Sequence, residues 1–180
     1  MIAGSIARRY AKALLEIGVA QRNFDALNRE LERVAALYHD SKELSEVLAN
    51  PIFPLARRQG VVEELVRRLA LSKVIRNFLL LLLDRGRIAY LPSIAREHRA
   101  LVDLQAGRLR ARVTVAKALG PQLEARIKAT LEKKTGKAVL LETREDPSII
   151  GGVVTQVGDL VYDGSVRTQL QTLREQLLAE

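Results

Sequence analysis

The sequence predicts an α+β protein: an N-terminal all-α six-helix bundle, followed by a small α+β domain with a mixed sheet and a C-terminal helix. Three observations lead to this fold class. Apolar residues recur at helical spacing through residues 1–105, runs with the alternation of strands cluster after Gly107, and Gln105-Ala106-Gly107 marks the shift between the two patterns. We therefore expect two domains, residues 1–105 and residues 106–180.

Six helices joined by short links are expected in the first domain. Their apolar stripes run over residues 6–17, 24–38, 44–48, 55–69, 74–85 and 91–102. Ser41 and Ser72 stand where N-caps are expected for the third and fifth helices. The fifth helix contains the run Phe78 to Leu83, which is apolar on every side and therefore predicts a helix surrounded by others. Gly86 is placed to end that helix, and Pro92 fits the first turn of the sixth.

The second domain begins with a strand, because Leu109 to Val115 alternates between apolar and polar residues. Gly120-Pro121 then starts a helix, which closes at Thr135-Gly136. A second strand is expected from Ala138 to Thr143, and Asp146-Pro147 reads as a loop.

A hairpin and a final helix follow. The β-branched run Val153 to Val157 is separated from Leu160-Val161-Tyr162 by Gly158-Asp159, a pair typical of a tight hairpin turn. We expect Asp163-Gly164 to form a second turn and Ser165 to cap the last helix. The apolar stripe of that helix consists of Val166, Leu170, Leu173 and Leu177. Gly151-Gly152, at the start of the hairpin, indicates a strand bend or a close approach of two backbones.

Composition excludes several classes of function. The chain has no Cys, which excludes disulfides, thiolate metal sites and Cys catalysis, and it has two His, too few for most metal sites. Its longest apolar run is the six residues Phe78–Leu83, whereas a membrane span needs about 20. We expect a soluble chain that reaches a membrane only through a partner.

No residue pattern points clearly to catalysis. Asp159 and Asp163 flank a hairpin strand and could act as an acid–base pair, although Asp in such positions more often bonds to the turn backbone. Gly136-Lys137 does not complete a phosphate-binding loop, because Leu131 stands where the motif needs Gly and Ala138 where it needs Ser or Thr. Ser165 is better explained as a cap than as a nucleophile. A small enzyme that uses Asp159 or Asp163 is kept as a third hypothesis.

The net charge of +8 raises the alternative of a basic nucleic-acid-binding protein. Its basic clusters are Arg57-Arg58, Arg67-Arg68, Arg108-Arg110-Arg112 and Lys133-Lys134. No aromatic residues are interleaved with them to stack on bases, which weakens this alternative. An Ala-rich first helix would also allow another helix to approach closely, either a helix of the same domain or an amphipathic helix of a partner. The residues leave both possibilities open.

Two stretches resemble a known family. GGVVTQVGDLVYDGSVRTQLQTL, residues 151–173, resembles the C-terminal signature of the delta subunit family of F-type ATP synthases, which includes the mitochondrial oligomycin sensitivity-conferring protein. IARRYAKAL, residues 6–14, resembles the opening helix of that family, so the resemblance covers the whole chain. The signature residues are Gly151, Gly152, Gly158, Asp159, Asp163, Gly164 and Ser165.

The resemblance implies a non-catalytic peripheral-stalk (stator) subunit without cofactor or metal, at the cytoplasmic face of a bacterial plasma membrane. In such a subunit the N-terminal domain takes the N-terminal helix of an alpha subunit between its first and fifth helices. The C-terminal domain joins the C-terminal ends of the b subunits, so that the catalytic head resists the torque of the rotor. The resemblance implies no nucleic-acid partner. Carried onto this sequence, the residues that would contact the alpha helix are Tyr10, Ala13, Leu14, Phe78, Leu79 and Leu82.

Overall fold

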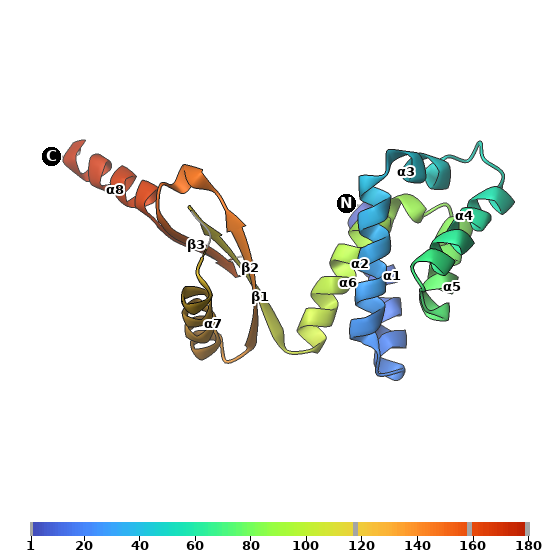
Figure 1. The fold of residues 1–180 in the computed structure, drawn as a ribbon, viewed down its shortest axis with the longest axis horizontal. Helices are drawn as coiled ribbons and strands as arrows, with labels where there is room; N and C mark the ends of the chain where they lie inside the picture. The colour runs from blue at the N-terminus through green and yellow to red at the C-terminus, as the bar shows by residue number, and fades with distance from the viewer. Residues whose placement is uncertain (1, 117–118, 158–159, 179–180) are drawn as a thin grey trace. The chain divides into compact units, whose positions relative to one another are not determined.

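The computed structural model describes residues 2–116, 119–157 and 160–178. Within them it contains helices and one four-stranded mixed sheet, which confirms the predicted α+β class (Figure 1). The chain divides into two compact units, Met1–Val102 and Asp103–Glu180. The composition shift at Gln105-Ala106-Gly107 lies a few residues after this division.

The first unit consists of helices joined by short turns and loops, and its described residues include no strand. Its elements are α1 (Ile2–Ala20), α2 (Phe24–Asp40), α3 (Lys42–Ala49), α4 (Leu55–Arg68), α5 (Lys73–Asp84), the 3-10 turn η1 (Ile88–Tyr90) and most of α6 (Leu91–Gln105). Two of the helices begin at the predicted caps: Ser41 Oγ accepts from Leu44 N–H at 3.2 Å, and Ser72 Oγ accepts from Ile75 N–H at 3.4 Å. Gly86 follows α5 with φ +63°, the left-handed conformation that favours glycine after a helix.

The core of this unit is built from aliphatic side chains of all six helices and η1. Its fully buried large residues include Leu14, Leu27, Leu31, Leu48, Ile75, Leu79, Leu82, Leu91 and Ile94. The expectation that α5 is surrounded on every side is wrong, because Leu81 is 43% exposed. The neighbouring helices cover only part of its circumference, so the side of α5 that carries Leu81 is open to solvent.

The second unit is built around a sheet of strand order β2-β1-β3-β4. The strands are β1 (Arg108–Val115), β2 (Ala138–Glu145), β3 (Gly152–Val157) and β4 (Leu160–Ser165), with the helices α7 (Pro121–Thr135) and α8 (Val166–Leu178) and the 3-10 turn η2 (Pro147–Ile149). β1 and β2 are parallel and are connected through α7, whereas β3 runs antiparallel to both β1 and β4. The sheet is therefore mixed, as predicted.

The two faces of the sheet differ in chemistry. Ala111, Val113 and Val115 of β1 share one face with Val139 of β2, and all four are buried. α7 packs beside β2, and its half-buried Ile127 and Leu131 lie on one side of that helix. The opposite face carries Arg and Glu side chains. The alternation read from residues 109–115 thus corresponds to a strand with one buried and one polar face.

The turn expected at Asp163-Gly164 is wrong. Both residues lie within β4, where Asp163 is opposite Val154 and Gly164 is opposite Val153. The pairing with β3 continues as far as Ser165, and α8 begins directly afterwards. The expected loop at Asp146-Pro147 contains the short turn η2.

Candidate functional site

Aromatic residues join α1 to α5 in the helical unit. The rings of Tyr10 and Phe78 meet edge to face, with centroids 6.2 Å apart and planes inclined at 71°. The guanidinium of Arg87 lies over the Tyr10 ring at 5.5 Å from its centroid and donates a hydrogen bond to the Tyr10 hydroxyl at 2.7 Å. Aromatic pairs and cation–π contacts of this kind favour a defined geometry. These contacts therefore hold α1 and α5 in a defined position relative to each other.

The six residues predicted to contact a partner helix differ in accessibility. Three of them are inside the core, because Leu14, Leu79 and Leu82 are at most 1% exposed. Phe78 is 7% exposed, Tyr10 is half-buried and Ala13 is exposed. In this conformation a docked helix could touch Tyr10 and Ala13 directly, whereas the three leucines are packed in the core beneath the surface. Partner binding by the six residues stays a prediction.

Two exposed apolar residues beside this junction were not among the six. Ile17, on the same side of α1 as Tyr10, is 42% exposed, and Leu81, one turn after Phe78 on α5, is 43% exposed. Helical spacing marks both as apolar-face residues, but spacing does not tell which part of a broad stripe the neighbouring helices cover. We call the set Tyr10, Ala13, Ile17, Phe78 and Leu81 the α1–α5 surface.

In the second unit the glycine signature has a structural explanation. Gly152 has φ +80°, and a Cβ built on it would lie 2.3 Å from the carbonyl oxygen of Gly164. The two backbones thus approach so closely that no side chain fits. Gly151 continues the pairing, since its carbonyl oxygen accepts from Val166 N–H at 3.0 Å. Gly158 and Asp159, also part of the signature, lie outside the described residues.

Asp163 and Ser165 form the N-terminal cap of α8. Ser165 Oγ accepts from Thr168 N–H at 3.2 Å. The Asp163 carboxylate accepts from Ser165 N–H at 2.9 Å and from the Thr168 hydroxyl at 2.8 Å. The backbone hydrogen bond from Ser165 is the main cause that lowers the pKa of Asp163. These contacts give both side chains a capping role, which accounts for them without an acid–base or nucleophilic function.

Replacement of the cap tests this assignment. We expect Ser165→Ala to lower the free energy of unfolding of the second unit by about 0.5–2 kcal/mol, because an N–H of the first turn of α8 loses its acceptor. Ser165→Asp should be tolerated, because a carboxylate can accept the same bond and suits the helix N-terminus. Denaturant titration of the wild type and both variants measures the difference. Equal losses in both variants would contradict a capping role.

α8 also presents an apolar face. Val166 is 36% exposed and Leu170 is 55% exposed, and these are two of the four residues in the predicted stripe. The side chains of the other two, Leu173 and Leu177, lie outside the described ones. On the neighbouring β4, Val161 is 59% exposed and Tyr162 is 58% exposed. The second unit thus exposes apolar side chains on its last strand and its last helix.

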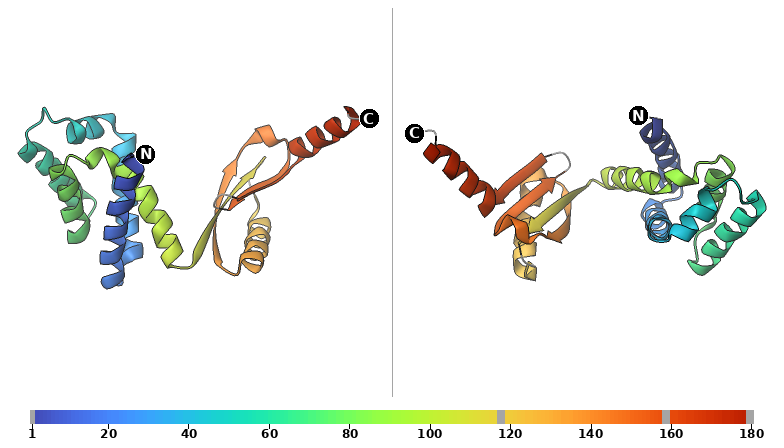
Figure 2. Two further views of the ribbon diagram at one scale, coloured as in Figure 1. Left: turned by 180° about the vertical axis from the view of Figure 1, so that it is seen from behind. Right: turned by 90° about the horizontal axis from the view of Figure 1, so that it is seen from above.

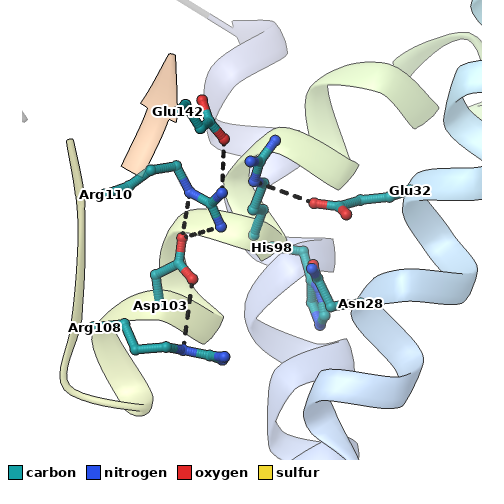
Figure 3. A network of polar contacts seen from close by, with 8 residues as sticks. Asn28, Glu32, His98, Asp103, Arg108, Arg110 and Glu142 are labelled. Carbon is teal, nitrogen blue, oxygen red and sulfur yellow. Dashed lines mark hydrogen bonds and ion pairs between the residues drawn. The ribbon is translucent and has the colours of Figure 1, made fainter. Parts of the chain in front are cut away.

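The basic residues of β1 are only partly available to an acidic ligand. Arg110 bonds to Asp103 Oδ2 at 2.8 and 2.9 Å and to Glu142 Oε1 at 2.7 Å, and Arg108 lies 3.8 Å from Asp103 Oδ1 (Figure 3). Burial alone would lower the pKa of Arg110, but its hydrogen bonds to the two carboxylates outweigh burial and raise the pKa. The central Arg of the cluster Arg108-Arg110-Arg112 is thus already paired with two carboxylates. This cluster therefore gives the nucleic-acid alternative no support.

His98 is buried inside the helical unit. It is 0% exposed, and its Nδ1 lies 3.0 Å from Oδ1 of Asn28 on α2 (Figure 3). Burial lowers the pKa of His98 from 6.5 to about 4. Beside this pair, Glu32 and Arg99 form an ion pair at 3.3 Å. His98 is therefore a neutral structural residue that links α6 to α2.

The described residues contain no group of three or more His, Asp or Glu side chains that could hold a metal ion. No helix in this part of the chain has the length and apolar character that crossing a membrane requires.

Comparisons with known proteins agree over nearly the whole chain. The family model described as ATP synthase delta (OSCP) subunit matches residues 6–177. A protein of Anaeromyxobacter dehalogenans named ATP synthase subunit delta is 46% identical over 98% of this chain and 99% of its own. One of Citrifermentans bemidjiense with the same name is 44% identical over 97% of each chain. A chain in the Toxoplasma gondii mitochondrial ATP synthase hexamer has the same fold, with a TM-score of 0.71 and 25% identity over 97% of this chain and 98% of that one.

Proposed function

The chain belongs to the ATP synthase delta (OSCP) subunit family, and from this membership we propose that it is a non-catalytic stator subunit of a proton-translocating F-type ATP synthase. In this proposal residues 1–105 hold the N-terminal helix of an alpha subunit on the catalytic head. Residues 106–180 hold the C-terminal ends of the b subunits. The link prevents the head from turning with the rotor. The protein acts at the cytoplasmic face of the bacterial plasma membrane, which it reaches through the complex.

One observation supports this role beyond family membership: each of the two compact units exposes apolar side chains on helices. In the first unit these lie on the α1–α5 surface, and in the second they lie on α8. A protein that connects two partners needs two such surfaces on two separate cores. Both surfaces are helical, and an amphipathic partner helix can bury its own apolar stripe against them.

The free energy gained by burying apolar area on such a surface is large enough for specific binding. Burial of apolar surface contributes about 25 cal/mol per Å², so a few hundred Å² yields several kcal/mol. Part of this is offset by the loss of translational freedom and by the ordering of the partner helix. Ile17 and Leu81 are each more than two-fifths exposed in the free chain, so they have apolar area left to bury. The buried Leu14, Leu79 and Leu82 contribute by holding the backbone of this surface in place.

A charge placed on the α1–α5 surface should weaken its affinity for an apolar helix. We expect Ile17→Asp and Leu81→Asp each to weaken binding of a peptide from the alpha subunit N-terminus at least about tenfold, because a carboxylate would have to lose its hydration without gaining a partner. Isothermal titration calorimetry with the full chain measures this. Circular dichroism should show both variants folded, since the changed side chains already face solvent.

Leu37 provides a matched control. It is an exposed leucine on α2, 39% exposed and outside the α1–α5 surface, so Leu37→Asp should bind the peptide as the wild type does. If Leu37→Asp lost affinity as strongly as the two test variants, the peptide would not be bound at the α1–α5 surface. If Ile17→Asp and Leu81→Asp bound normally, the proposed site for the alpha subunit would be wrong.

A further inference from the structure

Arg87 is held in one position beside the α1–α5 surface. α1 and α5 are drawn in blue and green in the left view of Figure 2, and the contact between Tyr10 and Phe78 joins them. Arg87 follows α5 and is half-buried. Its backbone N–H donates to Leu82 C=O at 2.7 Å, and its guanidinium lies against the ring and the hydroxyl of Tyr10. The side chain is therefore already ordered in the free chain.

No carboxylate among the described residues pairs with this guanidinium, whereas the other half-buried arginines of the helical unit have acceptors. Arg76 and Arg99 each pair with a glutamate of a neighbouring helix, and Arg58 donates to two backbone carbonyl oxygens. Arg87 donates only to the neutral hydroxyl of Tyr10. Since a guanidinium has five N–H donors, most of those on Arg87 bond to no described residue.

The Tyr10 hydroxyl supplies a second donor at the same place. Its oxygen accepts the hydrogen bond from Arg87 at 2.7 Å, so its own proton is directed elsewhere. None of the described residues accepts that proton. Two donor groups therefore lie side by side at one end of the α1–α5 surface. One of them is charged, and both can bond to a further acceptor.

A helix that docks on the α1–α5 surface would displace water from these two groups. Burial beneath an apolar side chain would leave a charge and a hydroxyl without an acceptor, which opposes binding. A carboxylate removes this cost, because it only accepts hydrogen bonds and its two oxygens match the planar guanidinium. The donors thus favour an occupant that carries an acidic side chain at this position.

Other charges near Tyr10 favour an occupant of the same sign. On α1 the exposed Arg9 and Lys12 flank Tyr10 in the sequence, and neither forms an ion pair within the described part of the chain. The carboxylate of α5, Asp84, is turned to α4, where it accepts from a glutamine side chain at 3.2 Å. Positive charge therefore predominates around Arg87, and it attracts an acidic group.

We propose that Arg87 and the Tyr10 hydroxyl form a binding site for one Asp or Glu side chain of the helix that docks on the α1–α5 surface. This inference rests on the proposed function, which assigns that helix to the N-terminus of the alpha subunit. The carboxylate accepts from both donors, and the apolar stripe beside it covers Ala13, Ile17 and Leu81. Because the site lies at the Tyr10 end of the surface, it fixes the direction and register of the docked helix, which apolar contacts alone leave open.

Amide substitutions in the partner test the site without any change to this chain. The probe is a peptide of the alpha subunit N-terminus from the same organism, in which each Asp is changed to Asn and each Glu to Gln, one at a time. Isothermal titration calorimetry with the wild-type chain should show one change that weakens binding at least about fivefold, because it removes a charge from a desolvated pair. The other changes should cost less than about twofold, because exposed charges are screened.

A double-mutant cycle assigns the lost interaction to Arg87. Arg87→Met keeps a long unbranched side chain without the charge, and it should bind the unchanged peptide at least about fivefold more weakly than the wild type does. The critical amide peptide should then bind this variant as well as the unchanged peptide does, because the pair is already broken. An Arg87 that only positioned Tyr10 would instead weaken every peptide by the same factor. Added salt should weaken binding to the wild type more than binding to Arg87→Met.

Arg85→Met is the matched control. Arg85 lies at the end of α5, is exposed and forms no ion pair within the described residues. Its replacement removes the same charge two residues before Arg87. This variant should bind the unchanged peptide within about twofold of the wild type, because an exposed charge outside the site contributes little. Circular dichroism should show both variants folded.

The outcomes separate the carboxylate site from the proposed function. Coupling between one peptide carboxylate and Arg87, with normal binding by Arg85→Met, supports the site. If the peptide binds and all its amide versions bind equally well, or if Arg87→Met weakens every peptide alike, the site is wrong while the proposed function stands. If the folded wild-type chain does not bind the unchanged peptide, the assignment of the alpha subunit is wrong and the inference fails with it.

Discussion

Gly152→Val is expected to destabilise the second unit by about 3 kcal/mol or more, while the helical unit remains folded. A residue with a side chain at φ +80° is strained, which costs of order 1–3 kcal/mol. In addition, its Cβ would lie 2.3 Å from the carbonyl oxygen of Gly164, and this neighbour is backbone in the paired strand β4. Relief of the clash requires β3 and β4 to separate at the point where the signature glycines meet, which adds an overpacking cost of about 1–3 kcal/mol.

Gly120→Ala is the matched control for this substitution. Gly120 precedes α7 in the same unit, and a Cβ there would meet no atom of the described residues within 4 Å. Its loss should stay below about 1 kcal/mol, because Gly is preferred to Ala at an N-cap but Ala also lowers the conformational entropy of the unfolded chain, and the two effects partly cancel. Urea denaturation of the full chain, followed by amide exchange in β3 and β4, measures both. A Gly152→Val protein whose hairpin amides remain as protected as in the wild type would contradict the close-approach explanation.

Local signals in the sequence predicted most of the secondary structure. Ser41 and Ser72 cap the helices that they were expected to cap, and Gly136 ends α7 with φ +66°. Each of these positions depends on a few neighbouring residues only, because a cap or a left-handed glycine satisfies the backbone of a single turn. The mixed character of the sheet also follows from the order of the elements, since a helix between two strands permits a parallel pair and a short hairpin requires an antiparallel one.

Long-range contacts account for what the sequence did not predict. Asp163-Gly164 has the composition of a turn, but pairing with Val153 and Val154 keeps both residues in a strand. Local turn preference loses to the hydrogen bonds of a continued ladder. In the same way, helical spacing placed Ile17 on an apolar stripe, and only the arrangement of neighbouring helices leaves it exposed. The exposed part of a candidate binding surface depends on tertiary packing.

Acidification should destabilise the helical unit through His98. The residue is completely buried, and burial lowers its pKa from 6.5 to about 4. Because Asn28 Oδ1 can only accept a hydrogen bond, His98 Nδ1 carries the proton of the neutral ring. Nε2 has no hydrogen-bond partner among the described residues. A proton added there would place a charge in the core without a partner, so the folded state resists protonation.

The sign of the effect follows from proton binding. In the unfolded chain His98 takes up a proton near its ordinary pKa of about 6.5, whereas in the folded chain it does so only near pH 4. Between these values the unfolded state binds more protons, so the contribution to stability is complete above about pH 6.5 and falls as the pH is lowered. The total loss amounts to about 3 kcal/mol, of which about 2 kcal/mol should appear between pH 7 and pH 4.5.

Urea denaturation at pH 7 and pH 4.5 measures this loss, and His98→Gln should abolish most of it because glutamine does not titrate. His39→Gln is the matched control: His39 is exposed in the last turn of α2, so this variant should lose stability as the wild type does. Carboxylates such as Glu63 and Asp163, whose pKa values are lowered mainly by hydrogen bonds, act at lower pH. Their own losses begin below about pH 4.5, so the window above it isolates the histidine. An NMR titration that placed the pKa of His98 at or above 6.5 would refute the prediction, because a residue protonated equally in both states cannot make stability depend on pH.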